Sequence, residues 1–256
     1  MHRFDWFARS ALATPTNQMV HGAFRRLGDD AVRVVHSRHD AATLMSPSDF
    51  TTMPWKNGKG STLELAVAFA PDDKANFAWR LSRASVTSDG PFSNFPGIDR
   101  VLTVLPGGGG GLSLCVGDDT HIVRPFEPIT FSGDDAASSK LLSGGLEDFN
   151  VMTRRGSARA SVQAYYLSGA SLRAGPTVGE ADHSFLYCIE GEVEVLNAPG
   201  AGKGCKVPTS HALRMAWTDH ARKKVDSDRR DGPVEIVSNS DAKIIWVDIV
   251  ELWRAL

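Results

Sequence analysis

The chain has 256 residues, 42% of them hydrophobic and 23% charged, and its 28 basic and 30 acidic residues give a formal net charge of -2. This composition is typical of globular proteins and excludes a largely disordered chain. The balanced charge provides no overall positive field for nucleic acid or for an anionic membrane surface.

The N-terminal segment and the cysteines indicate the cellular compartment of the protein. Residues 1–31 interrupt their few apolar positions with charges, so we expect an N-terminal extension rather than a signal peptide. No apolar run approaches the ~18 residues of a membrane-spanning helix. Cys115, Cys188 and Cys205 lie far apart and form no C-x-x-C pair, which predicts reduced thiols. We therefore expect a cytoplasmic protein that binds neither membrane nor nucleic acid.

The first predicted element is a short helix near Pro47–Thr52. Ser46 is a favourable N-cap, Pro47 suits the first helical position, and Asp49 lies three residues after the cap. A residue that precedes a proline avoids the helical region, so the helix has to end before Pro54, after one to two turns. Because this is the best helix signal in the chain, we expect only a few short helices.

Strand signals dominate the rest of the chain. Apolar and small or polar side chains alternate over Thr62–Phe69, and a second alternation over Ala78–Val86 places Trp79 on one face and Arg80 and Ser82 on the other. Further short runs of strand type, separated by glycine, proline and aspartate, are Val101–Leu105, Leu112–Val116, His121–Val123, Ile129–Phe131, Phe149–Met152, Val162–Tyr166, Phe185–Ile189, Val193–Leu196 and Ile244–Val250. Many short strands at this spacing favour an all-β sandwich or barrel.

Familiar catalytic and metal-binding motifs are absent from the sequence. The run at residues 57–62 resembles a phosphate-binding loop, but Gly60 interrupts the required Gly-Lys-Ser/Thr order and a strand follows. The glycines at 107–111 lie between two strands, as in a hairpin connection. No H-x-H pair occurs, whereas a metal site in a barrel would need histidines at alternate strand positions. We therefore expect no metal and no cofactor.

The candidate site consists of polar and aromatic residues from three segments, at residues 55–64, 80–95 and 148–150. Arginine suits a carboxylate because its planar fork donates two parallel hydrogen bonds. An alternative that the spacing leaves open is that Arg80 pairs with Glu64 or Asp148 and only fills the interior. The candidate ligand-binding residues are Trp55, Asn57, Glu64, Arg80, Ser82, Phe92, Phe95, Asp148 and Asn150.

Four ordered blocks resemble the HutD/Ves family, a cupin-like family often associated with histidine-utilisation operons. They are MPWKNGKGSTLELA (Met53–Ala66), the run from Phe77 to Gly109, FSGD (Phe131–Asp134) and DFNVMTRR (Asp148–Arg155). The resemblance covers roughly residues 32–155. One departure is the run Gly58-Lys59-Gly60, where the family suggests a double glycine after Asn57.

The resemblance implies a bicupin, with two cupin-like β-barrels in one chain and no histidine-rich metal motif. We expect the first barrel over residues 32–158, which carry the family blocks, and the second over residues 159–256. The weak joint between them falls at residues 153–161. The role proposed for the family is to bind a small acidic intermediate of histidine breakdown, such as a formylated glutamate, and so to moderate the pathway.

Three functions remain open at this point. The first, which we favour, is a non-catalytic protein that binds a small acidic amino-acid derivative. The second is a metal-independent hydrolase or isomerase that uses Glu64 or Asp148 as general base. The third is a structural module whose polar cluster only fills a barrel. The sequence also leaves open whether the protein forms a homodimer.

Overall fold

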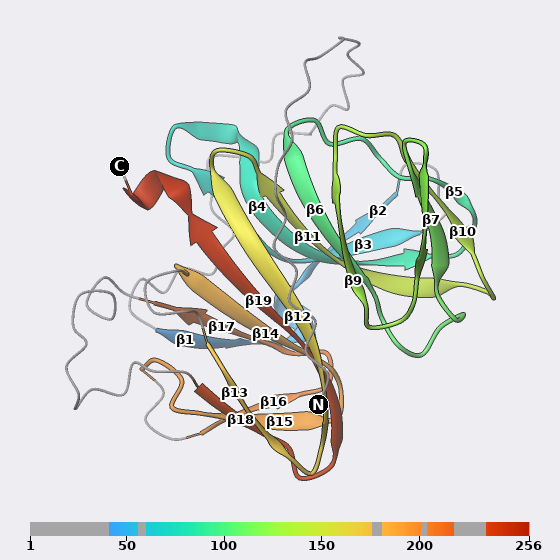
Figure 1. Cartoon of the computed structure of the whole chain (residues 1–256). Coiled ribbons are helices and arrows are strands. Elements are labelled where there is room, and N and C mark those ends of the chain that lie inside the picture. Colours follow the sequence, from blue (N-terminus) through green and yellow to red (C-terminus); the bar gives the residue numbers. More distant parts are fainter. Residues whose placement is uncertain (1–40, 56–59, 176–180, 201–203, 218–233, 256) are drawn as a thin grey trace.

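The computed structural model describes residues 41–55, 60–175, 181–200, 204–217 and 234–255. In this part of the chain the regular elements are strands β1 to β19 and two short 3-10 helices. The strands form four sheets, and the strand pairs within them are antiparallel (Figure 1). The all-β class expected from the strand spacing is therefore confirmed.

The first half of the chain supplies two of the sheets. The six-stranded sheet has the order β2 (Thr51–Pro54), β3 (Ser61–Ala70), β4 (Asp73–Val86), β11 (Leu146–Arg154), β6 (Ile98–Val104) and β9 (Pro128–Ser132). The four-stranded sheet that accompanies it has the order β5 (Gly90–Pro91), β10 (Ala137–Leu141), β7 (Leu112–Val116) and β8 (Asp119–Val123).

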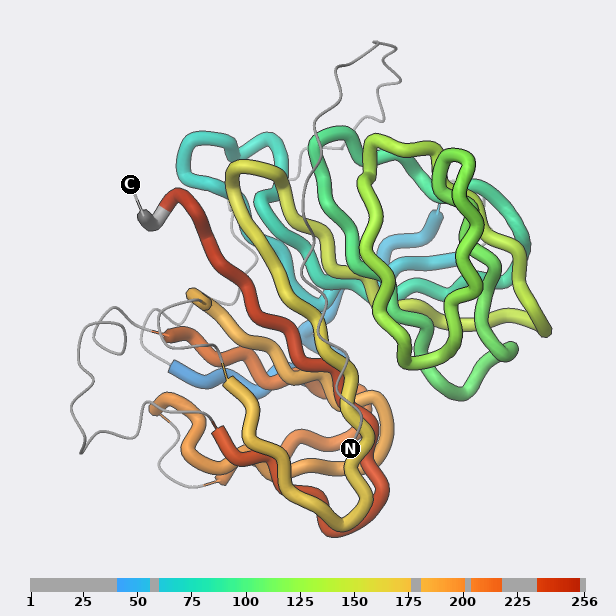
Figure 2. The backbone as a smooth tube through the Cα atoms, viewed as in Figure 1, coloured from blue at the N-terminus to red at the C-terminus, as the bar shows by residue number. Residues whose placement is uncertain are grey.

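The second half supplies the other two sheets. The five-stranded sheet has the order β1 (Ala42–Met45), β17 (Ala212–Ala216), β14 (His183–Glu190), β19 (Asp241–Glu251) and β12 (Ala158–Ser168). The remaining sheet has the order β13 (Ser171–Ala174), β18 (Val234–Val237), β15 (Glu192–Leu196) and β16 (Cys205–Pro208). Although β1 precedes the first-half strands in sequence, it pairs with β17, and Figure 2 shows this blue segment beside the orange strands of the second half.

The four sheets form successive layers with three apolar cores between them. The central core, between the six-stranded and five-stranded sheets, includes Trp79, Leu81, Phe149, Phe185, Tyr187 and Val247. The first-half core includes Leu102, Val104, Leu112, Leu114 and Leu146. The second-half core includes Leu186, Val195, Leu213, Ile236 and Trp246. Each of the two large sheets is therefore covered on both faces, which explains the uninterrupted apolar run from Ile244 to Val247 in β19.

Two expectations about local structure were wrong in detail. The predicted helix near Pro47–Thr52 is only the 3-10 turn η1 (Pro47–Asp49), because Thr51 and the residues after it pair with β3. The alternation over Thr62–Phe69 also changes phase. A bulge between Glu64 and Ala66 shifts the register against β4, so the alanines after the bulge, rather than Val67, join the central core.

The two halves are joined by a tight turn. Strand β11 ends at Arg154, and the Ser157 amide donates a hydrogen bond to the Arg154 carbonyl at 3.0 Å. Gly156 has a φ of +80°, a conformation that glycine adopts without steric cost. The segment expected to be a weak joint is thus a turn between strands of two different sheets. A second 3-10 helix, η2 (Leu252–Ala255), follows β19, and no helix in the described ranges is long and apolar enough to cross a membrane.

Candidate functional site

Five of the predicted site residues lie on one face of the six-stranded sheet. Glu64, Ser82 and Asn150 are direct partners across β3, β4 and β11, and direct partners share a face. Arg80 and Asp148 each lie two residues before one of them, so they share that face as well. The same face carries Leu102 and Val104 of the first-half core. We name as the polar strip the residues Glu64, Arg80, Ser82, Arg100, Asp148 and Asn150.

Arg80 forms an ion pair within the polar strip. Its Nε donates to Glu64 Oε2 at 2.7 Å, and the two side chains are 14% and 21% exposed. The alternative left open by the sequence, a pair between Arg80 and Glu64, is therefore present. Among the described residues, however, none accepts a hydrogen bond from the Nη atoms of Arg80. Half of the guanidinium fork is thus held in place and half of it can still bind an anion.

Arg100 belongs to the polar strip but was not among the predicted residues. It is 3% exposed, and its Nη2 donates to Asn150 Oδ1 at 3.1 Å. Its guanidinium lies over three aromatic rings. The distance from Arg100 Cζ to the ring centroid is 5.3 Å for Phe92, 5.5 Å for Phe95 and 4.8 Å for Phe131. Burial lowers the pKa of Arg100 to about 10, so the side chain stays a cation at neutral pH. Strand β6 begins at Ile98, three residues before the predicted start at Val101. Arg100 therefore lies within the strand, two residues before Leu102, and this spacing could have shown that the two side chains share a face.

Asp148 is the buried acidic group of the polar strip. The side chain is 1% exposed, and Asn150 Nδ2 donates to its Oδ1 at 2.8 Å. Its other oxygen, Oδ2, has no hydrogen-bond partner in the described structure. Burial raises the pKa of the Asp148 carboxyl to about 6, against the opposing effects of the Asn150 hydrogen bond and the Arg100 charge. A buried acceptor without a donor is uncommon and marks a place for a proton, a water molecule or a ligand.

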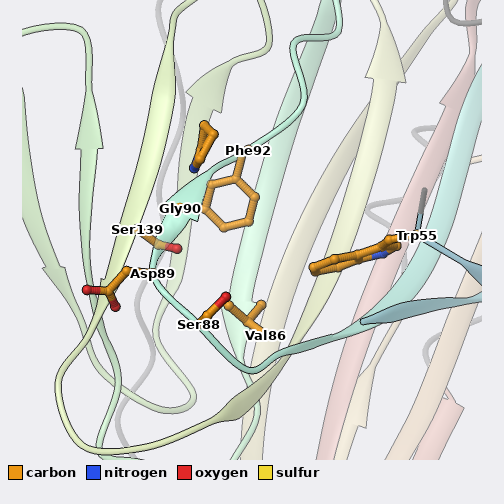
Figure 3. Close-up of a pocket in the computed structure, with 8 residues that line it drawn as sticks. Trp55, Val86, Ser88, Asp89, Gly90, Phe92 and Ser139 are labelled. Atoms are coloured by element: carbon orange, nitrogen blue, oxygen red, sulfur yellow. The ribbon is translucent and has the colours of Figure 1, made fainter. Parts of the chain in front are cut away.

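The predicted aromatic residues occupy two places. Trp55 Nε1 donates to Thr62 Oγ1 at 2.9 Å, and Trp55 and Phe92 both line a cavity of about 120 Å³. In Figure 3 the two rings lie on opposite sides of this cavity. Phe95 does not line this cavity. Its ring centroid lies 6.4 Å from that of Phe77, and its ring also contacts the Arg100 guanidinium. Asn57 lies outside the described residues, so its predicted role stays a prediction.

Further residues of the cavity were not predicted as site residues. They come from the end of β4, from β5 and from β10, and Figure 3 shows Phe92 and the Ser139 hydroxyl beside one another. Around Asp89 the sequence had predicted only the nearby Phe92 and Phe95 as site residues. The added lining residues are Val86, Ser88, Asp89, Gly90, Pro91 and Ser139. Within the described ranges, no three histidine, cysteine, aspartate or glutamate side chains gather as metal ligands.

Comparison with known proteins identifies the family. A family model described as HutD matches residues 47–230. An uncharacterized 21.2 kDa protein in the hutC 3′ region of Pseudomonas putida is 39% identical over 152 residues, which are 59% of this chain and 76% of the relative. Protein Ves of Citrobacter koseri is 40% identical over 119 residues, which are 45% of this chain and 61% of Ves.

A solved structure agrees with these sequence matches. HutD from Pseudomonas fluorescens SBW25, in a formate condition, superposes with a TM-score of 0.63 at 25% identity, over 82% of this chain and 98% of HutD. The family match therefore covers more than half of this chain and includes every strand of the polar strip. The chain belongs to the HutD/Ves family.

Proposed function

We propose that this protein binds a small acidic amino-acid derivative in the cytoplasm, without catalysing a reaction, through the polar strip of its first half. The carrying observation is Arg80, whose Nε is fixed by Glu64 while no described residue accepts from its Nη atoms. A carboxylate can accept two parallel hydrogen bonds from such a fork. The buried charge of Arg100 on the same face adds to the attraction of an anion.

The acceptor side of the polar strip favours a ligand that also carries an N–H group. Asp148 Oδ2 has no donor in the described structure, and an amide or amine of a ligand would supply one. An N-acylated glutamate combines carboxylates with an amide N–H. Membership of the HutD family, together with a relative in a hutC 3′ region, supports an intermediate of histidine breakdown such as N-formylglutamate.

We further propose that each half forms a cupin-like barrel, as in a bicupin. The two sheets of each half enclose an apolar core, and the polar strip lies on the inward face of the first half. A ligand there would be shielded from water, which strengthens its hydrogen bonds with buried charges.

A binding experiment with matched variants tests the proposal. N-formyl-L-glutamate at a hundredfold excess over its Kd should stabilise the native state by about 2.7 kcal/mol, a rise of roughly 5–10 °C in Tm for a chain of this size. Arg80→Lys keeps the charge but loses the fork and should reduce the rise. Arg159→Lys, at an exposed position of β12, is the control. No shift with N-formylglutamate, N-formiminoglutamate, urocanate, histidine or glutamate would reject the histidine-pathway ligand.

One observation favours a second candidate, a metal-independent enzyme with Asp148 as general base. Its pKa of about 6 allows a carboxyl group to exchange protons near neutral pH. Incubation of the protein with N-formyl-L-glutamate, followed by proton NMR, would reveal a product. Turnover that is lost in Asp148→Asn would establish the enzyme, whereas an unchanged spectrum with bound ligand supports the binding protein.

A further inference from the structure

The FSGD block (Phe131–Asp134) is the one family block that contributes no residue to the polar strip. It begins within β9, next to β6 in the six-stranded sheet, and continues into the turn that follows (Figure 1). Phe131 and Arg100 are direct partners across these two strands, so their side chains share a face. The Phe131 ring centroid lies 4.8 Å from Arg100 Cζ, the shortest of the three ring distances. The block therefore adjoins the buried cation of the proposed binding site.

The loop between β5 and β6, residues 92–97, also covers the Arg100 guanidinium. It provides two of the three rings, and its Ser93 carbonyl accepts from Arg100 Nη1 at 3.4 Å. Arg100 Nη2 in turn donates to Asn150, which donates to Asp148. The place of this loop therefore affects the guanidinium and, through it, the acceptor side of the polar strip.

The turn of the FSGD block holds this loop through backbone hydrogen bonds. The Phe95 amide donates to the Gly133 carbonyl at 2.9 Å, and the Gly133 amide donates to the Ile98 carbonyl at 2.7 Å. A Cβ at Gly133 would lie 2.5 Å from the Phe95 carbonyl oxygen and 2.9 Å from that of Ile98, closer than Cβ atoms come to other atoms in proteins. Only glycine therefore lets the turn approach the loop this closely.

Asp134 adds a side-chain contact to this attachment. Its Oδ1 accepts from the Gly97 amide at 2.7 Å, and its Oδ2 accepts from the Ser132 hydroxyl at 3.2 Å and from the Arg155 guanidinium. The Arg155 amide donates to the Gly97 carbonyl at 3.0 Å, so both polar groups of the Gly97 backbone are held. The side chains of Asp134 and Arg155 are 48% and 40% exposed, and ion pairs this exposed contribute little to stability.

We propose that Asp134 is a positioning residue of the polar strip, which holds the loop of residues 92–97 so that its rings fix and shield the Arg100 guanidinium. Its importance rests on the function proposed above, because a fixed guanidinium matters for an anionic ligand. A cation shielded from water attracts an anion more strongly than a hydrated one. A guanidinium that is already fixed also loses less conformational entropy on binding. Loss of the attachment should therefore loosen Arg100 and weaken binding, although Asp134 itself does not touch the ligand.

The Nε–H resonance of Arg100 reports this position directly. The proton lies close to three phenylalanine rings, whose ring currents displace its resonance from those of exposed arginines. In ¹⁵N-labelled protein, with Arg100→Lys to assign the signal, Asp134→Ala and Gly133→Ala should move it towards the exposed arginines. Asp134→Asn keeps an oxygen for the Gly97 amide and should leave it near the wild-type position. Asp135→Ala, which removes the adjacent exposed carboxylate, is the matched control, and the backbone amide spectrum reports an intact fold.

Calorimetric titration with N-formyl-L-glutamate measures the effect on binding. We expect Asp134→Ala to raise the Kd by about fivefold to tenfold and Asp134→Asn by less than about twofold, with no change in Asp135→Ala. Wild-type affinity in Asp134→Ala despite a displaced Arg100 resonance would show that the attachment is only structural. A resonance that stays in place in both Asp134→Ala and Gly133→Ala would also overturn the proposal. If the wild type binds none of the five compounds named above, the function proposed there fails, and the Arg100 resonance alone decides whether Asp134 positions the guanidinium.

Discussion

The interiors of the two halves differ in how they satisfy their buried polar groups. At one end of the second-half core, Trp217 Nε1 donates to Ser184 Oγ at 2.8 Å, Ser184 donates to Asp248, and Trp246 Nε1 donates to the same Asp248 oxygen at 2.9 Å. In the first half, Asp148 Oδ2 and Arg100 Nε have no partner within the described structure. The second-half network is complete without a ligand, whereas the first half retains free hydrogen-bonding capacity.

This difference is what the proposed function requires, because polar groups that stabilise a fold have internal partners and polar groups that bind a ligand keep some capacity free. A buried polar group without a partner costs free energy, so most proteins pair such groups internally. The network around Ser184 in the second-half core does so with hydroxyl, indole and carboxylate groups. The first half keeps a cation and an acid that are only partly paired, as a binding site does before its ligand arrives.

The largest expected effect comes from Arg100→Met, which removes the buried cation of the first half. Asp148 then loses the compensating charge of Arg100, and we expect a loss of about 3–5 kcal/mol in the free energy of unfolding at pH 7.5. The loss should be smaller at pH 5, where a carboxyl group with a pKa of about 6 is protonated. Urea unfolding at the two pH values measures both effects. A loss that is equal at both would show that Arg100 stabilises the fold by packing alone.

The second-largest effect is expected from Asp148→Asn, which should raise the free energy of unfolding at neutral pH rather than lower it. The folded state raises the pKa of Asp148 from 3.8 to about 6, so it binds the proton more tightly than the unfolded chain does. Stability should therefore decrease as the pH rises from about 4 to about 6, by up to about 3 kcal/mol. Asp148→Asn keeps an acceptor for Asn150 and cannot ionise, so it should match the wild type near pH 4 and exceed it at pH 7.5.

The pH dependence of urea unfolding, measured from pH 4 to 7.5, distinguishes this group from exposed carboxylates. Asp119→Asn is the control, because Asp119 lies exposed on β8. If Asp148→Asn retained the wild-type decrease between pH 4 and 6, another group would be responsible, and the contrast between the two halves would lose its electrostatic basis.

A smaller effect is expected in the second half from Trp246→Phe. This change removes the indole donor to Asp248 while it keeps an aromatic ring in the second-half core, so we expect a loss of about 1–3 kcal/mol. The loss should not vary between pH 5 and 8, since the removed donor does not titrate in that range. Trp55→Phe removes a comparable bond to Thr62 at a half-buried position and should cost less. A larger cost for Trp55→Phe would reverse the comparison.

The smallest effect on stability should come from Glu64→Gln. The ion pair with Arg80 is partly exposed, at 14% and 21%, and such pairs contribute less than about 1 kcal/mol. Ligand binding should respond more strongly than stability, because Glu64 orients the Arg80 fork. Parallel urea unfolding and calorimetric titration with N-formylglutamate would measure the two effects. A stability loss above 2 kcal/mol would instead assign the pair a structural role.

The all-β class and the orientation of side chains within single strands follow from the sequence alone. Alternation over β4 correctly separated Arg80 and Ser82 from Trp79, because successive side chains of a strand point to opposite faces. The same rule placed Asp148 and Asn150 on one face of β11. These features depend only on residues a few positions apart, so a local pattern is enough to predict them.

Tertiary structure decided which strands meet and in what register. The pairing of β1 with β17, the bulge in β3 and the meeting of Arg100 with three phenylalanines depend on residues that are distant in sequence. A bulge of one residue moves every later side chain of the strand to the other face. The cavity beside β5 likewise exists only because β10 brings Ser139 next to Gly90. Packing between sheets sets these contacts, and the residue pattern of a single strand therefore cannot predict them.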